Sequence, residues 1–115
     1  MGDKMAKTQT QVTFEQIVEF VKEDRYHYSG HAEERMAERG ITDGQVRETL
    51  LTGEIIETYT EDLRGWSYLI LGFSDGQPLH VQVGYNRYRK LAIIITLYTP
   101  EPPKWVSPRQ RGSDS

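Results

Sequence analysis

The spacing of apolar residues changes once along this chain, at Gly53, and this change limits the possible folds more than any other feature. Before Gly53, apolar residues recur every three or four positions, as on one face of an α-helix. After it, they alternate with polar residues, as on a β-strand with one buried face. Helices followed by a run of strands are typical of an α+β domain.

Three helices are expected in the first half. The first begins at Thr13, where Thr13 and Gln16 can form a capping box, and ends near residue 24. The second runs from about residue 31 to 39 and stops before a glycine. The third begins with a second capping box, Thr42 with Gln45. Residues 26–29, between the first two helices, are expected to form a short extended link.

Four strands are expected in the second half. They cover residues 55–59, 66–73, 79–85 and 91–98, and an Asp-Gly turn joins the second to the third. In the last strand, Leu91, Ile93, Ile95 and Leu97 are expected on one face, and Ala92, Ile94, Thr96 and Tyr98 on the other. We therefore expect an α+β domain with its N-terminal helices packed on one face of a four-stranded antiparallel meander.

The length of 115 residues indicates one domain, expected over residues 12–105. Residues 1–11 are expected to be a flexible lead-in, and residues 106–115 a flexible tail beyond a proline-rich end of the last strand. No apolar run approaches the roughly 20 residues that span a bilayer, so a cytoplasmic protein without membrane contact is expected.

Composition excludes some kinds of chemistry. Cysteine is absent, so disulfides, thiolate nucleophiles and cysteine zinc sites are excluded, and neither a metal site nor a cofactor is expected. The net charge of −3 counts against a nucleic-acid binder. However, residues 61–115 hold 7 Lys/Arg against 5 Asp/Glu, whereas residues 1–60 hold 7 against 12. A polyanion would therefore have to meet the second half.

His31, Arg35 and Arg39 are four residues apart and therefore share one stripe of the second expected helix. Two guanidinium groups and an imidazole on one surface can bind and polarise a phosphodiester. The alternative is a solvated helix face whose arginines pair with nearby glutamates, and spacing alone favours this alternative.

His80 lies in the middle of the third expected strand, on the face opposite Leu79 and Val81. An imidazole titrates near neutral pH and suits proton transfer. If the last two strands form a hairpin, Thr96 and Tyr98 can converge with His80. The alternative is a histidine that is merely satisfied by a hydrogen bond at the edge of the core, and His80 taken alone favours this alternative.

Further basic residues are candidates for RNA contact. The turn between the last two strands gathers Arg87, Arg89 and Lys90 around Tyr88, and such residues can pair with phosphates and stack on bases. The same composition is ordinary for an exposed hairpin tip. Arg64, in the loop before the second strand, is a weaker candidate for phosphate contact.

The run of residues 29–42, Ser-Gly-His-Ala-Glu-Glu-Arg-Met-Ala-Glu-Arg-Gly-Ile-Thr, resembles the opening motif of the family named domain of unknown function 4258. That motif starts Ser-x-His-Ala, has arginines at two later helix positions and continues Arg-Gly-Ile. The similarity extends through residues 53–57, 76–81 and 94–98, and covers about residues 26–105.

This family looks like the small toxin ribonucleases related to RelE, whose N-terminal helices pack against an antiparallel sheet. The resemblance implies a partner, since members are often encoded beside a small antitoxin with a zinc-binding Cys-x-x-Cys segment. The motif positions in this chain are His31, Arg35, Arg39, His80, Thr96 and Tyr98. The acidic isoelectric point, about 5.6, departs from that group, whose toxins are commonly basic.

These features favour a metal-independent endoribonuclease, the toxin of a toxin–antitoxin pair. RNA is cut when its 2′-hydroxyl attacks the adjacent phosphate, and an enzyme moves two protons and stabilises the phosphorane. His80 or His31 would move the protons with help from Tyr98, while Arg35 and Arg39 would stabilise the phosphate.

Two alternatives stay open. One is a non-catalytic module that binds RNA or a partner protein through the same face. The other is an interaction domain in which Arg35 and Arg39 only pair with nearby glutamates. Convergence of both arginines and His31 with His80 in one cleft would favour catalysis, whereas arginines that point away from His80 would favour binding.

Overall fold

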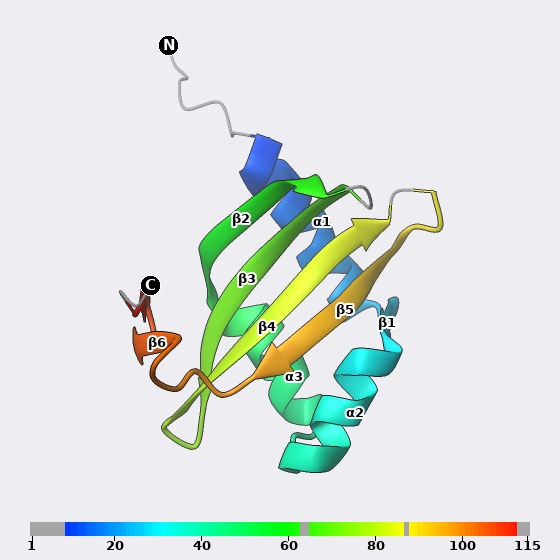
Figure 1. Cartoon of the computed structure of the whole chain (residues 1–115). Helices are drawn as coiled ribbons and strands as arrows, with labels where there is room; N and C mark the ends of the chain where they lie inside the picture. The colour runs from blue at the N-terminus through cyan, green and yellow to red at the C-terminus, as the bar shows by residue number, and fades with distance from the viewer. Residues whose placement is uncertain (1–8, 63–64, 87, 113–115) are drawn as a thin grey trace.

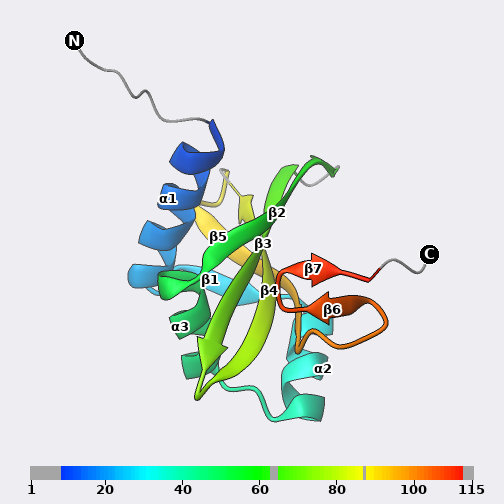
Figure 2. The same cartoon turned by 90° about the vertical axis from the view of Figure 1, so that its left-hand side faces the viewer.

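A computed structural model describes residues 9–62, 65–86 and 88–112, with the backbone alone for 9–12 and 61–62. Three helices pack on one face of a five-stranded sheet, and a small two-stranded hairpin lies on the other side (Figures 1 and 2). None of the helices in this described part is long and apolar enough to cross a membrane.

The elements follow the order helix, strand, two helices and six strands. The helices are α1 (Gln9–Lys22), α2 (Gly30–Arg39) and α3 (Asp43–Thr52). The main sheet consists of β1 (Tyr26–Tyr28), β2 (Glu54–Asp62), β3 (Gly65–Ser74), β4 (Gln77–Asn86) and β5 (Leu91–Tyr98). The hairpin consists of β6 (Trp105–Ser107) and β7 (Gln110–Arg111). The strand order in the main sheet is β1-β5-β4-β3-β2.

The expected α+β class, with helices on one face of the sheet, is confirmed, but the four-stranded antiparallel meander is wrong. Residues 26–28 are extended between the first two helices, as expected, but they also form a strand, β1, which pairs in parallel with residues 92–94 of β5. As the chain passes from α1 to α2, it runs along the outer edge of β5, whose backbone groups would otherwise lack partners. The sheet is therefore five-stranded and mixed.

The expected helix boundaries are confirmed in part. Thr42 and Gln45 form the expected capping box, in which the Thr42 side chain accepts from the Gln45 amide at 3.1 Å. Gly40 ends α2 with a positive φ of 68°. The first capping box is wrong, because α1 begins at Gln9 and Thr13 lies inside the helix. Nothing in the sequence of residues 9–12 breaks a helix, so α1 extends through them.

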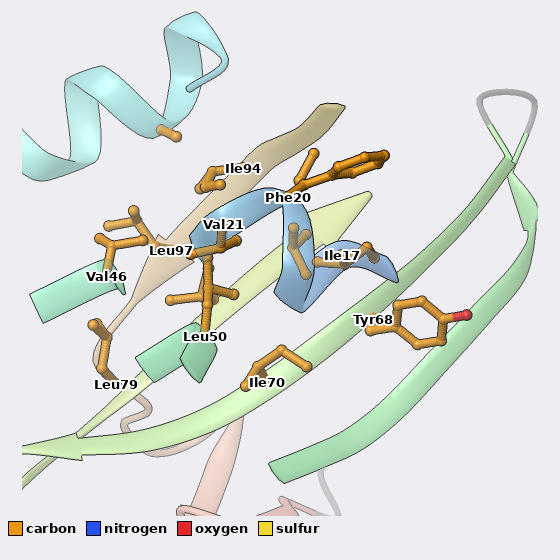
Figure 3. Packing of buried hydrophobic residues seen from close by; sticks show 14 residues of the cluster. Ile17, Phe20, Val21, Val46, Leu50, Tyr68, Ile70, Leu79, Ile94 and Leu97 are labelled. Carbon is orange, nitrogen blue, oxygen red and sulfur yellow. The ribbon is translucent and has the colours of Figure 1, made fainter. Parts of the chain in front are cut away.

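The hydrophobic core lies between the helices and the sheet (Figure 3). Its fully buried side chains include Ile17 and Val21 from α1, Val46 and Leu50 from α3, Ile70 from β3, and Ile94 and Leu97 from β5. Every helix therefore contributes to one core, because Ala32 of α2 is buried in the same cluster.

A β-bulge changes the expected faces of β5. Gln82 of β4 pairs with Thr96, but the next residue, Val83, pairs with Ile94, so that β5 holds one extra residue. Ile94 and Leu97 consequently both face the core, although they are three residues apart. The expected regular alternation along this strand is wrong.

Candidate functional site

The face of the sheet that points away from the helices, here called the outer face, carries two rows of side chains set by the strand register. Directly paired residues project on the same side of a sheet. The first row is Glu54, Leu71, His80 and Tyr98, from β2, β3, β4 and β5. The second row, from the same strands, is Glu57, Leu69, Gln82 and Thr96.

His80 is fully buried on the outer face and makes contacts through both ring nitrogens. Its Nε2 lies 2.7 Å from the carbonyl oxygen of Pro108, and its Nδ1 lies 3.3 Å from the hydroxyl of Tyr98. Because a carbonyl can only accept, Nε2 carries the proton and donates it, which leaves Nδ1 to accept from Tyr98. The expected convergence of His80 with Tyr98 is present.

Burial lowers the pKa of His80 below its ordinary value, because the charged imidazolium would lose its hydration. The hydrogen bond to Pro108 and the negative charge of Glu57 act in the opposite direction but are smaller. His80 is therefore a neutral imidazole at pH 7, the form that can accept a proton.

Trp105 covers the His80 ring. The two rings are nearly perpendicular, at 88°, with centroids 4.4 Å apart, and Trp105 is only 2% exposed. The guanidinium of Arg111 lies over the indole ring of Trp105, 4.7 Å from its centroid. Trp105 thus brings a cation of the hairpin and the imidazole of the sheet into one cluster.

Two ion pairs connect the hairpin to β2, at the far edge of the sheet. Arg109 donates to both carboxylate oxygens of Glu54, at 2.8 and 3.2 Å. Arg111 donates to both oxygens of Glu57, at 2.6 and 2.8 Å. Hydrogen bonding from the guanidinium lowers the pKa of each glutamate, so both carboxylates stay ionised and are weak bases. The Tyr59 hydroxyl also donates to Glu57.

The hairpin therefore lies across the outer face from the end of β5 to β2 (Figure 2). Residues 106–115 were expected to be a flexible tail, whereas the structure places residues 105–111 in this hairpin. Residues 113–115 lie outside the described part. Sequence reasoning missed Glu57 and Arg111, and the only available signal for Arg111 was the alternating pair of arginines after Pro108.

The candidate residues on α2 are not brought to His80. His31 and Arg39 are exposed, Arg35 is half-buried, and α2 packs against the helix side of the sheet through Ala32. His80 faces the opposite side. Within the described residues, neither Arg35 nor Arg39 forms an ion pair or a side-chain hydrogen bond, so the expected pairing with nearby glutamates is also absent there.

The remaining candidates lie apart from His80 or outside the described part. Thr96 is half-buried in the neighbouring row of the outer face. Arg89 and Lys90 are exposed in the β4–β5 turn, and β4 ends at Asn86, six residues beyond His80, or about 20 Å along an extended strand. Arg64 and Arg87 lie outside the described residues.

Comparison with known proteins gives one match. The profile of the family described as domain of unknown function (DUF4258) matches residues 28–99. No curated protein and no solved structure matches the chain significantly. The matched span holds α2, α3 and β2–β5, including His80 and Tyr98, and ends before the hairpin. Because the match covers more than half of its length, the chain belongs to the DUF4258 family.

Proposed function

We propose that the chain is a metal-independent endoribonuclease, the toxin of a toxin–antitoxin pair, and that it cuts RNA on the outer face of its sheet. The observation that supports this most is the clustering of a neutral imidazole, a phenol and a guanidinium around Trp105. These groups belong to His80, Tyr98 and Arg111. They supply a base, an acid and a cation, which are the three functions that RNA cleavage requires.

In the proposed reaction the 2′-hydroxyl of RNA attacks the adjacent phosphorus. A bond forms between O2′ and phosphorus while the bond from phosphorus to O5′ breaks, which leaves a 2′,3′-cyclic phosphate and a 5′-hydroxyl. Nδ1 of neutral His80 takes the proton from the 2′-hydroxyl. Tyr98, which already donates to Nδ1, gives its proton to O5′ and regains one from the imidazolium. The Arg111 guanidinium stabilises the negative charge of the phosphorane.

Glu57 is not the base in this proposal. Its carboxylate is held by Arg111, and that interaction lowers its pKa further below neutrality. A general base works best when its pKa lies near the working pH, and His80 is the nearer of the two groups. Glu57 instead neutralises Arg111 in the conformation described.

A second candidate function, a non-catalytic RNA-binding or protein-binding module, is favoured by the geometry of α2. Arg35 and Arg39 lie one helical turn apart, pair with no described carboxylate and do not meet His80. Such guanidiniums can bind phosphate oxygens. Under this reading, an antitoxin could use the same surface of α2, whereas Arg89 and Lys90 would contact RNA separately, at the opposite end of β5 (Figure 1).

Cleavage of a labelled single-stranded RNA by the purified full chain tests the first proposal. We expect 2′,3′-cyclic phosphate ends, and we expect His80→Gln to slow cleavage by about 10²- to 10⁴-fold, the usual contribution of a general base. Arg35→Gln/Arg39→Gln is the matched comparison, since it removes two arginines away from the outer face. If the wild type binds RNA without cutting it, and only the double variant loses binding, the module is the better description.

Induced expression in bacterial cells tests the toxin role separately. Growth arrest by the wild type should be relieved in His80→Gln and retained in Lys22→Gln, which removes an exposed cation of α1 to which no role is assigned, provided that both variants accumulate to the same level. Arrest of equal strength in the wild type and His80→Gln would contradict a toxin that acts through His80.

A further inference from the structure

We propose that the β6–β7 hairpin is an autoinhibitory cover. In the closed form, Glu54 and Glu57 hold Arg109 and Arg111 in place of RNA phosphates. In the open form, the hairpin exposes His80, and its arginines bind the RNA backbone, with Arg111 on the phosphate that lies beside His80. The RNA part of this inference rests on the proposed function, whereas the movement of the hairpin does not.

The hairpin closes off His80 completely. Trp105 packs at a right angle to the imidazole, and the Pro108 carbonyl accepts the hydrogen bond from Nε2. The Tyr98 hydroxyl donates to Nδ1, and no part of the His80 side chain is exposed. A substrate as large as RNA therefore cannot reach either ring nitrogen while the hairpin is in place.

Within the described residues, every hydrogen bond or ion pair between the hairpin and the main sheet involves a side chain, and the only backbone group among them is the Pro108 carbonyl. The backbone–backbone hydrogen bonds of the hairpin stay inside the C-terminal segment: the Trp105 amide donates to the Glu101 carbonyl at 3.0 Å, and the Gly112 amide donates to the Lys104 carbonyl at 2.8 Å. No strand pairing joins β6 or β7 to the main sheet. The hairpin can therefore leave as a unit without breaking a β-ladder.

The two ion pairs are suited to exchange with phosphate. Each is bidentate, the geometry with which a guanidinium binds either a carboxylate or a phosphate. Both arginines and Glu54 are about half exposed, so salt and polyanions have access to the pairs. Polyanions therefore compete directly with β2 for the hairpin, and binding them favours the open form.

Chemical modification of histidine by diethyl pyrocarbonate measures the opening directly. The chain has three histidines, and His27 and His31 are exposed, so they serve as internal references for His80. Two double variants, Glu54→Gln/Glu57→Gln and Arg109→Gln/Arg111→Gln, each remove both ion pairs. Rates are read by peptide mass spectrometry in the full chain, well below the melting temperature.

We expect both double variants to raise the modification rate of His80 by roughly tenfold, since an exposed ion pair contributes up to about fivefold to such an equilibrium. The rates at His27 and His31 should not change. Glu34→Gln/Glu38→Gln, two exposed glutamates of α2, gives the same charge change without touching the hairpin and should leave His80 protected. Equal protection of His80 in the wild type and both double variants would overturn the cover.

The affinity for a single-stranded RNA distinguishes the role of the glutamates from the role of the arginines in the ion pairs. The Glu54/Glu57 variant frees the arginines and should bind RNA more tightly than the Glu34/Glu38 control. The Arg109/Arg111 variant opens the hairpin equally but should bind more weakly than the wild type. Equal RNA affinities of the two hairpin variants, despite equal exposure of His80, would overturn the role of the glutamates as phosphate substitutes.

These readouts also separate the cover from the proposed reaction. If His80 becomes reactive and the RNA affinities change in opposite directions, while no variant cuts RNA, the cover is supported and the ribonuclease proposal fails. If the wild type cuts RNA but His80 stays protected in both hairpin variants, the cover fails and the ribonuclease proposal survives.

Discussion

Replacement of His80 by Gln or by Asn distinguishes between its two ring nitrogens. The amide nitrogen of Gln reaches about as far from the backbone as imidazole Nε2, whereas that of Asn reaches only as far as Nδ1. Nε2 makes the shorter hydrogen bond, 2.7 Å to Pro108, against 3.3 Å between Nδ1 and Tyr98. Gln can therefore keep the bond that connects β4 to the hairpin, and Asn cannot.

The expected loss in the free energy of unfolding follows from these contacts. Both variants lose the perpendicular packing of the imidazole on Trp105, a contact worth about 0.5–1.5 kcal/mol. Asn also leaves the Pro108 carbonyl without its donor inside a covered site, which costs about 1–3 kcal/mol more. The free energy of unfolding should therefore be lower in His80→Asn than in His80→Gln by about 1–3 kcal/mol.

Urea unfolding at pH 7.5, fitted with a common m-value, measures this difference. Unfolding of the full chain includes undocking of the hairpin, so neither loss can exceed the free energy with which the hairpin docks. The Asn result thus also sets a lower limit on that docking energy. Equal stabilities of the two variants, or a more stable Asn variant, would refute the assignment of the donor to Nε2.

Two further predictions concern stability. Because burial lowers the pKa of His80 below 6.5, the unfolded chain takes up a proton before the folded chain does, so the free energy of unfolding should decrease as the pH falls below 6.5. Urea titrations between pH 7.5 and 5 should show this slope in the wild type and a smaller one in His80→Gln; equal slopes would contradict it. Gly72→Ala should destabilise by about 1–3 kcal/mol, because its Cβ would lie 2.9 Å from Thr49 of α3. A Gly72→Ala variant as stable as the wild type would refute the close approach of α3 to β3. Gly44→Ala, whose Cβ would have its nearest neighbour at 3.8 Å, should instead raise the free energy of unfolding by up to about 1 kcal/mol.

The sequence predicts those parts of the fold in which each residue acts through its immediate neighbours. The capping box of Thr42 and Gln45 needs only four residues, and the alternation around His80 needs only one strand. β1 could not be predicted in this way. Three residues are too few to show a period, and β1 exists only because β5, more than 60 residues later, offers its edge.

The candidate site was predicted only in part for the same reason. The convergence of His80 with Tyr98 follows from a hairpin of adjacent strands, which the sequence indicates. The contacts from Trp105 and Pro108 depend instead on how a short segment beyond the last strand folds back over the sheet. The ion pair between Glu57 and Arg111 spans 54 residues and has no periodic pattern.

The fold explains some residues of the DUF4258 motif and leaves others without a structural role. Ser29 caps α2 by accepting from the Ala32 amide at 3.0 Å and also donates to a carbonyl of β5 at 2.7 Å. Ala32 is completely buried, and Gly40 adopts the positive φ that ends α2. The two arginines of the motif, Arg35 and Arg39, have no such structural explanation, because they contact no described carboxylate and lie away from the outer face. This is why the binding proposal places its contacts on α2, while the cleavage proposal depends on residues that only the folded sheet and hairpin bring together.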